Sequence, residues 1–392
     1  MRSRQYILVL VTKLTETEGT GTEREANMTD LEFFDNDAAE VDGIRMEIWE
    51  PDLIVLPIPE NRLDANTPVQ INVFITNNTP TTFAFVYGIL TPELVEPGGQ
   101  ALHSQKLIDE QIPTSQYDGI GIPPKRSLVR CLIAKLSWQN NLLQLQASIS
   151  DSRRIPTGSD NLWSFGFLQL GTYQLRFTYL SPKEEFLFAD AHTGDISRVE
   201  SAETEPLATP FVNLRLVEPV GSDKSAVEVG GIRFETVIPE RRLSTPLIQP
   251  NVKIPVQIGI QITNNTSTPF RFSSFDTLIP ELIGADGLIP RQNCGGSTGW
   301  KTPRESDFQL AMPGESVTLF PKAHLVWQAD GLLNLIVPGG GRACWKFNDL
   351  KLGTYKMQLT YRSPTEKPDL LFEDLWMGMV HTPFVEFHLV QP

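Results

Sequence analysis

The chain has 392 residues and a formal net charge of −14, with 40% apolar and 20% charged residues. Length alone predicts two or three domains, and the 28 Gly and 30 Pro favour a fold with many turns. The acidic balance argues against binding to nucleic acid or to an anionic lipid surface, because both are polyanions. No apolar stretch approaches the ~20 residues that cross a bilayer, so we expect a soluble, cytoplasmic protein without a membrane span.

The N-terminal segment, residues 1–41, is polar, acidic and poor in aromatic residues. Its one apolar run, Tyr6–Val11, follows two arginines. That run is shorter than the apolar region of a typical signal peptide, about 7–15 residues, and no small-residue cleavage site follows it. We therefore expect residues 1–41 to be disordered.

Two copies of one strand organise the rest of the chain. Leu170–Tyr179 reads LGTYQLRFTY, and Leu352–Tyr361 reads LGTYKMQLTY. In both copies apolar and polar side chains alternate, which is the pattern of a half-buried strand. The Gly-x-Tyr start resembles the penultimate strand of many immunoglobulin-like and fibronectin-like sandwiches, in which a Tyr near the strand start bonds back to the preceding corner.

Shorter matches in the same order surround this strand. The matched pairs are Gly43–Glu47 with Gly231–Glu235, Ile58–Leu63 with Ile238–Leu243, Pro68–Ile71 with Pro255–Ile258, Ile75–Thr79 with Ile262–Thr266, and Thr209–Val212 with Thr382–Val385. The Asn-Asn-Thr in the fourth pair is typical of a turn, so we interpret the sequons at Asn77 and Asn264 as one turn present twice. Residues 95–126 and 283–314 share almost nothing.

Several short alternating strands with turn signals between them indicate an antiparallel sandwich. The sequence therefore predicts an all-β chain of two tandem immunoglobulin-like antiparallel β-sandwich domains, related by an internal repeat. Domain 1 is expected at 42–217 and domain 2 at 231–392, and a short polar linker at 218–230 joins them.

No catalytic or metal-binding set assembles in the sequence. Gly295–Gly299 fits the G-x-S-x-G pattern of a nucleophile elbow, but that elbow needs a strand before it and a helix after it, and neither is indicated. The five His form no ligand cluster, and the acidic Asp190–Asp195 lacks the spacing of an EF-hand calcium loop. We expect a non-enzyme without metal or cofactor. A bridge between Cys294 and Cys344 stays open beside the alternative that all three Cys are thiols.

Three residues of the divergent loop in domain 2 are candidates for partner binding. They are Trp300, Arg304 and Phe308. Aromatic and Arg side chains are enriched at binding hot spots, but loop aromatics also fold back to cover a sandwich, and the sequence does not choose between the two.

The order of the motifs resembles the bacterial intracellular proteinase inhibitor domain. The Asn-x-Thr turn, the Pro-Gly-Glu-Ser step at Pro313–Ser316 and the Gly-x-Tyr strand carry this resemblance. Domain 1 departs from it, because Lys125–Ser127 stands where the Pro-Gly-Glu-Ser step is expected. The resemblance implies an immunoglobulin-like sandwich.

From these features we expect a non-catalytic protein-binding or scaffolding protein that acts through the divergent loops of two sandwich domains, with a protein partner that the sequence does not identify. Two alternatives stay open. One is a proteinase inhibitor with 283–314 as its bait loop, which the family resemblance implies, and the other is a hydrolase of unrecognised type.

Overall fold

A computed structural model of the chain describes residues 40–61, 65–86, 90–106, 119–149, 162–180, 186–190, 196–199, 206–222, 224–246, 252–285, 287–289, 292–293, 303–329, 331–339, 343–364 and 372–391. The regular secondary structure of these residues is almost entirely strand, and the one helix among them is the 3-10 turn η2 (Glu305–Asp307). The predicted all-β class is therefore confirmed for this part of the chain. None of its helices is long and apolar enough to cross a membrane.

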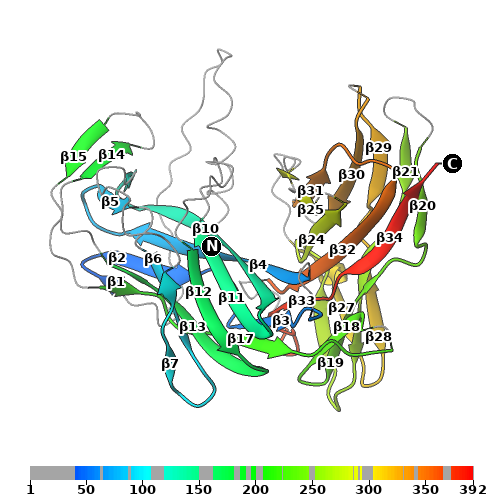
Figure 1. Ribbon diagram of the computed structural model, residues 1–392, viewed down its shortest axis with the longest axis horizontal. Coiled ribbons are helices and arrows are strands. Elements are labelled where there is room, and N and C mark those ends of the chain that lie inside the picture. Colours follow the sequence, from blue (N-terminus) through cyan, green and yellow to red (C-terminus); the bar gives the residue numbers. More distant parts are fainter. Residues whose placement is uncertain are drawn as a thin grey trace.

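The first repeat (residues 42–217) contains two sheets that pack face to face (Figure 1). One sheet has the order β1 (Glu40–Val41), β2 (Ile44–Ile48), β4 (Asn66–Asn77), β10 (Arg126–Gln139), β11 (Leu142–Ile149), β12 (Leu162–Leu168), β8 (Gln105–Lys106). The other has the order β3 (Leu53–Pro57), β17 (Val212–Val217), β13 (Gly171–Tyr179), β6 (Leu90–Val95), β7 (Ala101–Leu102), with β16 (Leu207–Ala208) also paired to β13. A small sheet has the order β15 (Ile196–Val199), β14 (Phe186–Asp190), β9 (Gly119–Ile122), β5 (Phe83–Val86).

The second repeat (residues 231–392), together with strand β18 just before it, has equivalent sheets. Two of them have the orders β18 (Ala226–Val229), β19 (Ile232–Val237), β22 (Gly259–Asn264), β28 (Ser316–Leu319), and β21 (Lys253–Pro255), β29 (His324–Trp327), β30 (Leu333–Pro338), β31 (Cys344–Phe347), β26 (Gln292–Asn293). A third has the order β20 (Arg242–Ser244), β34 (Val385–Val390), β32 (Gly353–Arg362), β33 (Met379–His381), with β24 (Leu278–Gly284) on β32 and β25 (Gly287–Ile289) on β24. A pair consists of β23 (Phe270–Ser273) and β27 (Phe308–Ala311).

The two repeats share one sheet. Strand β3 of the first repeat pairs in parallel with β33 of the second, so that Ile54 lies opposite Met379 and Val55 opposite Val380. This pairing gives a continuous sheet of twelve strands. Val55 lies in the hydrophobic core of the second repeat, and Met379 lies in that of the first. The two cores therefore exchange side chains at the junction.

Both predicted tyrosine contacts are present. The hydroxyl of Tyr173 accepts from the backbone N of Gln169 at 2.8 Å and donates to its O at 3.1 Å. In the second repeat, Tyr355 bonds in the same way to Lys351, at 2.8 and 2.7 Å. Each Tyr thus fixes the corner where its strand begins.

The predicted match between Ile58–Leu63 and Ile238–Leu243 is wrong. Strands β3 and β20 hold the equivalent place, because each pairs in parallel with the last strand of its repeat. The equivalent residues are Leu56 with Leu243, Ile58 with Thr245, and Pro59 with Pro246. The predicted alignment of the two similar sequences is therefore shifted by seven residues from the structural one. Backbone pairing, and not side-chain identity, decides which segment forms the strand.

The divergent stretches are shorter than predicted. Strand β9 pairs with β5 in the first repeat, and β27 pairs with β23 in the second. The two pairings are equivalent, since Ile122 lies opposite Phe83 and Ala311 lies opposite Phe270. The two repeats therefore rejoin before Lys125 and Pro313. The predicted linker 218–230 also contains β18, whose Val227 and Val229 lie in the second core.

Each repeat closes around a buried Asn. The Oδ1 atom of Asn264 accepts from Thr266 N at 3.0 Å and Oγ1 at 2.6 Å, and its Nδ2 donates to Thr268 O at 2.7 Å and Ala311 O at 2.9 Å. Asn77 makes the same four bonds, to Thr79, Thr81 and Ile122. Both side chains are 0% exposed. The interpretation of the two sequons as one turn present twice is confirmed.

We predict that Asn264→Ala lowers the free energy of unfolding by about 2–4 kcal/mol, because it leaves buried carbonyls without a donor. Asn264→Asp should cost at least as much, since a second oxygen would face those carbonyls. Urea unfolding measures both. The control Asn265→Ala, at an exposed neighbouring side chain, should change the free energy by less than about 0.5 kcal/mol. Equal effects at the two positions would contradict this account of the turn.

Candidate functional site

The structure does not bring the three sequence-predicted binding residues together on one surface. Trp300 lies outside the described residues, as does the Gly295–Gly299 motif. Arg304 is exposed at the start of η2, where its backbone N donates to the Asp307 carboxylate at 2.8 Å. Phe308 is only 4% exposed and packs against Phe372 with 5.1 Å between ring centroids. Its burial favours the covering role over the binding role.

Among the described residues, no group of three or more His, Cys, Asp or Glu could hold a metal ion. Most of the acidic segment Asp190–Asp195 lies outside those residues. The buried His381 instead bonds to Thr360, with 2.9 Å between Nδ1 and Oγ1.

Cys344 forms a disulfide bond, while Cys131 is not part of a disulfide. The chain has three Cys, so Cys294, which lies outside the described residues, is the remaining partner. The neighbouring strands agree with this pairing. β26 and β31 are antiparallel, with Asn293 opposite Trp345, so the described end of β26 lies beside the start of β31, where Cys344 is located. The alternative of three free thiols is thus contradicted.

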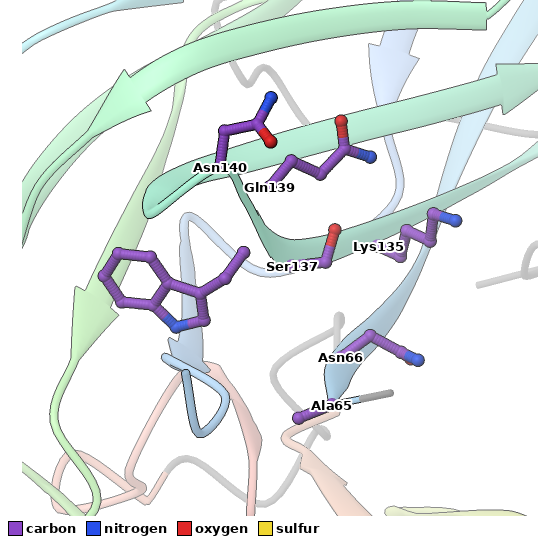
Figure 2. Close-up of a pocket in the computed structure, with 7 residues that line it drawn as sticks. Ala65, Asn66, Lys135, Ser137, Gln139 and Asn140 are labelled. Carbon is purple, nitrogen blue, oxygen red and sulfur yellow. The ribbon is translucent and has the colours of Figure 1, made fainter. Parts of the chain in front are cut away.

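The most distinctive surface is the outer face of the first repeat's sheet β4-β10-β11-β12, which we call the amide face. Its residues are Asn66, Lys135, Ser137, Gln139, Gln144, Gln146, Ser164 and Phe167. Two shallow depressions of about 370 and 310 Å³ cover it, and Gln139 lines both. In Figure 2 the side chains of Lys135, Ser137, Gln139 and Asn140 project from the green strands, and Ala65 and Asn66 come from the blue strand.

The strand register explains why these polar side chains gather. Side chains alternate between the two faces of a strand, so residues paired across strands share a face. One transverse row is Lys135, Gln146 and Ser164, and the next contains Asn66, Ser137 and Gln144. The alternate residues, such as Leu136 and Leu145, point into the core. Sequence alternation could have located this face, but only once the strands were paired correctly.

Ser137 belongs to this outer face but is as buried as a core residue. It is 8% exposed, and its Oγ has no hydrogen-bond partner among the described residues. An unsatisfied buried hydroxyl costs about 1–3 kcal/mol. The equivalent position in the second repeat is Val326, which is 2% exposed and carries no polar side-chain atom. The fold itself therefore accepts an apolar residue here, and the hydroxyl needs another explanation.

Phe167 is a second departure from the repeat. A β-bulge between β11 and β12 places it at φ +62°, in the left-handed region, and its side chain is 73% exposed. The matching residue in the second repeat is Asp349, at φ +54°. Asp tolerates this conformation, whereas for a bulky residue it costs about 1–2 kcal/mol. Neither backbone preference nor burial explains a phenyl ring at this position.

The junction between the repeats contains a buried acid. Glu50 is 5% exposed, and its carboxylate accepts from Asn72 N at 3.0 Å and Nδ2 at 2.8 Å. Burial raises the pKa of the Glu50 carboxyl to about 7, and the opposing charge of Arg362 limits this rise. The Arg362 guanidinium also lies over the Trp49 ring, 5.1 Å from its centroid. These contacts join the first repeat to the second and indicate a structural role.

No protein-family model matches the chain, and no curated protein resembles it in sequence. Any function must therefore be argued from the residues themselves.

We predict that peptide mapping without reduction will find Cys344 linked to Cys294 and Cys131 free. Reduction should lower the free energy of unfolding by about 2–4 kcal/mol, because the bond closes a long loop in the unfolded chain. The variant Cys131→Ser should leave the size of this reduction effect unchanged. Recovery of Cys344 as a free thiol from freshly purified, unreduced protein would refute the assignment.

We also predict a pH-dependent stability that is due to Glu50. Its pKa is about 7 in the folded chain and near the ordinary 4.5 in the unfolded chain. Between these values the folded chain binds a proton that the unfolded chain does not, so stability falls as pH rises, by about 1.4 kcal/mol per pH unit and about 3 kcal/mol in all. Below pH 4.5 and above pH 7 this group adds no slope.

Urea unfolding from pH 4 to 8 measures this effect. Glu50→Gln should flatten the fall between pH 4.5 and pH 7, since the side chain no longer titrates. The control Glu240→Gln removes an exposed carboxylate and should leave the slope unchanged. If Glu50→Gln and wild type had the same slope, Glu50 would titrate normally.

Proposed function

We propose that the chain is a non-catalytic binding protein whose binding surface is the amide face of the first repeat, and that its two repeats are immunoglobulin-like sandwiches. The observation that carries the proposal is the buried Ser137 hydroxyl, which has no hydrogen-bond partner among the described residues and belongs to a residue that lines one depression. A ligand that supplies its missing hydrogen-bond partner would offset the cost of burying it.

Two further features support a binding role without catalysis. Glu50, whose carboxyl pKa is raised to about 7, lies at the junction between the repeats. It is not among the residues that line the depressions. The lining consists mainly of amide, hydroxyl and apolar groups, which suit recognition more than acid–base or nucleophilic chemistry. The proposal keeps the class predicted from the sequence but moves the surface from the loops to a sheet face, because Phe308 is buried.

The immunoglobulin-like assignment rests on the paired tyrosine corners and on the parallel pairing of β3 with β17 and of β20 with β34. The Cys344 disulfide favours an oxidising compartment as the working location over the predicted cytoplasm, since cytosolic thiols are kept reduced. The continuous sheet supports a scaffolding role as part of the proposed function, because it would fix the orientation of the two repeats.

The experiment compares capture of host molecules by the full chain and by a variant with Gln144→Glu and Gln146→Glu. These exposed-face changes add negative charge to the site without entering the core, so we expect at least a tenfold loss of the specifically retained ligand. Gln257→Glu with Gln328→Glu makes the same change on the second repeat and should retain it. Equal retention by all three proteins would remove the amide face from the proposal.

A turnover assay on the retained ligand tests the non-catalytic part. We expect the ligand to be recovered intact after prolonged incubation with the full chain. Hydrolysis that Ser297→Ala abolishes would instead establish the enzyme alternative.

A further inference from the structure

We infer that the ligand of the amide face is a neutral oligosaccharide, bound across the strands by the amide and hydroxyl side chains and stacked on Phe167. This inference rests on the proposed function, because it names the ligand class for the same face. Two independent features carry it: the unpartnered hydroxyl of Ser137 and the exposed, left-handed Phe167.

The polar lining matches the hydrogen bonding of sugar hydroxyls. A carboxamide side chain both donates and accepts, and so does a hydroxyl, whereas an ionised ligand needs groups of the opposite charge. Among the described residues that line the two depressions, Lys135 is the only one that is always charged. One lysine is too little for a phosphate or polycarboxylate ligand on a chain of net charge −14. The lining therefore selects a neutral ligand with many hydroxyls.

The aromatic residue supplies the apolar part of such a site. A pyranose ring has hydroxyls at its rim and C–H groups on its faces, so it can place a C–H face on a phenyl ring while its rim reaches polar side chains. Phe167 is 73% exposed, so most of the residue is accessible to a ligand. It lines the second depression together with Gln144, Gln146 and Ser164. Ring and amides thus border the same space.

The dimensions favour a chain of sugars over a single sugar. From Asn66 on β4 to the bulge on β12 the face crosses three strand-to-strand steps, which is about 14 Å. The depression near Ser137 and the one near Phe167 lie beside each other, because Gln139 lines both. One ligand that contacts both must extend across the strands. An added peptide strand would instead need a free sheet edge, which this face does not offer.

The second repeat serves as an internal comparison for the same backbone. In place of Ser137, Gln146, Ser164 and Phe167 it carries Val326, Ile336, Lys346 and Asp349. Its sheet keeps the strands and a left-handed residue at the matching position, Asp349, but loses the hydroxyl, two neutral polar groups and the ring. Only the first repeat combines the features that a sugar site needs. Each difference also supplies a substitution that the fold is known to accept.

The test is isothermal titration calorimetry of the full chain with five hexasaccharides: cellohexaose, xylohexaose, mannohexaose, maltohexaose and chitohexaose. We expect at least one to bind. Phe167→Asp should weaken it at least tenfold, and Ser137→Val at least fivefold, because each replaces a site residue by its counterpart in the second repeat. Both variants should have a Tm equal to or above that of wild type. A purely structural role for either residue predicts no loss of binding.

The control Leu352→Asn removes a side chain that is 49% exposed on the second repeat, and it should bind like wild type. If either repeat-swap variant does not fold, Gln144→Ala with Gln146→Ala tests the same site from the surface and should also weaken binding at least tenfold.

The inference is overturned if wild type binds none of the five hexasaccharides at millimolar concentration, or if binding survives in all the face variants. The first result would leave the proposed function intact if host capture were still lost in the Gln144→Glu, Gln146→Glu variant. A ligand captured in that way would then belong to another chemical class, such as a protein. Loss of neither property would remove both proposals.

Discussion

The hydrogen bonds of one buried Asn side chain hold each repeat together. Asn77 and Asn264 end the strands β4 and β22, and each bonds at once to its own turn and to the strand β9 or β27 across the gap. A buried amide is tolerated only when both its donor and its acceptor are satisfied. The turn, the crossing strand and the end of the central strand must therefore form together. This constraint explains why the Asn-x-Thr motif is kept in both copies, while the loop between them differs.

Sequence reasoning recovered what alternation and turn chemistry encode. Strands β13 and β32, their tyrosine corners and the Asn turn are local patterns, and each is present as predicted. It misplaced Ile58–Leu63 because a short run of similar letters does not state which backbone groups pair. It treated Phe308 as a loop residue because strand β27 depends on its partner β23, which is 35 or more residues earlier in the chain. Non-local pairing is the information that a single sequence lacks.

The amide face was missed for a related reason. Ser137, Gln144, Gln146 and Ser164 look like ordinary outward residues of separate strands, and only their register makes them one surface. The signal that could have found them was the comparison of the two copies after correct alignment, because polar-for-apolar exchange at Ser137 and Val326 is visible in the sequence. Phe167 gave no signal, since its left-handed backbone follows from a bulge that spacing does not reveal.

The junction shows how the repeats manage their edge strands. An exposed apolar edge invites pairing with other chains, and charged side chains discourage it. Arg242 is the first residue of strand β20, Arg241 directly precedes it, and both are exposed. Strand β3, the equivalent in the first repeat, reads Leu-Ile-Val-Leu-Pro and is covered by β33. The apolar edge strand of the first repeat is thus paired with a strand of the second, and the Val55 side chain is buried in the second core. On this basis an isolated first repeat would expose that strand.

The two repeats have the same backbone at two positions but differ in how well the side chains there suit the fold. Proteins keep residues that disfavour folding mainly where those residues serve another purpose. Ser137 buries an unpaired hydroxyl, and Phe167 holds a ring in a conformation that suits Asp, yet the second repeat solves both positions at lower cost with Val326 and Asp349. Both departures lie on the same face of the same sheet. The proposed ligand would contact both residues, and its binding would offset the cost of keeping them.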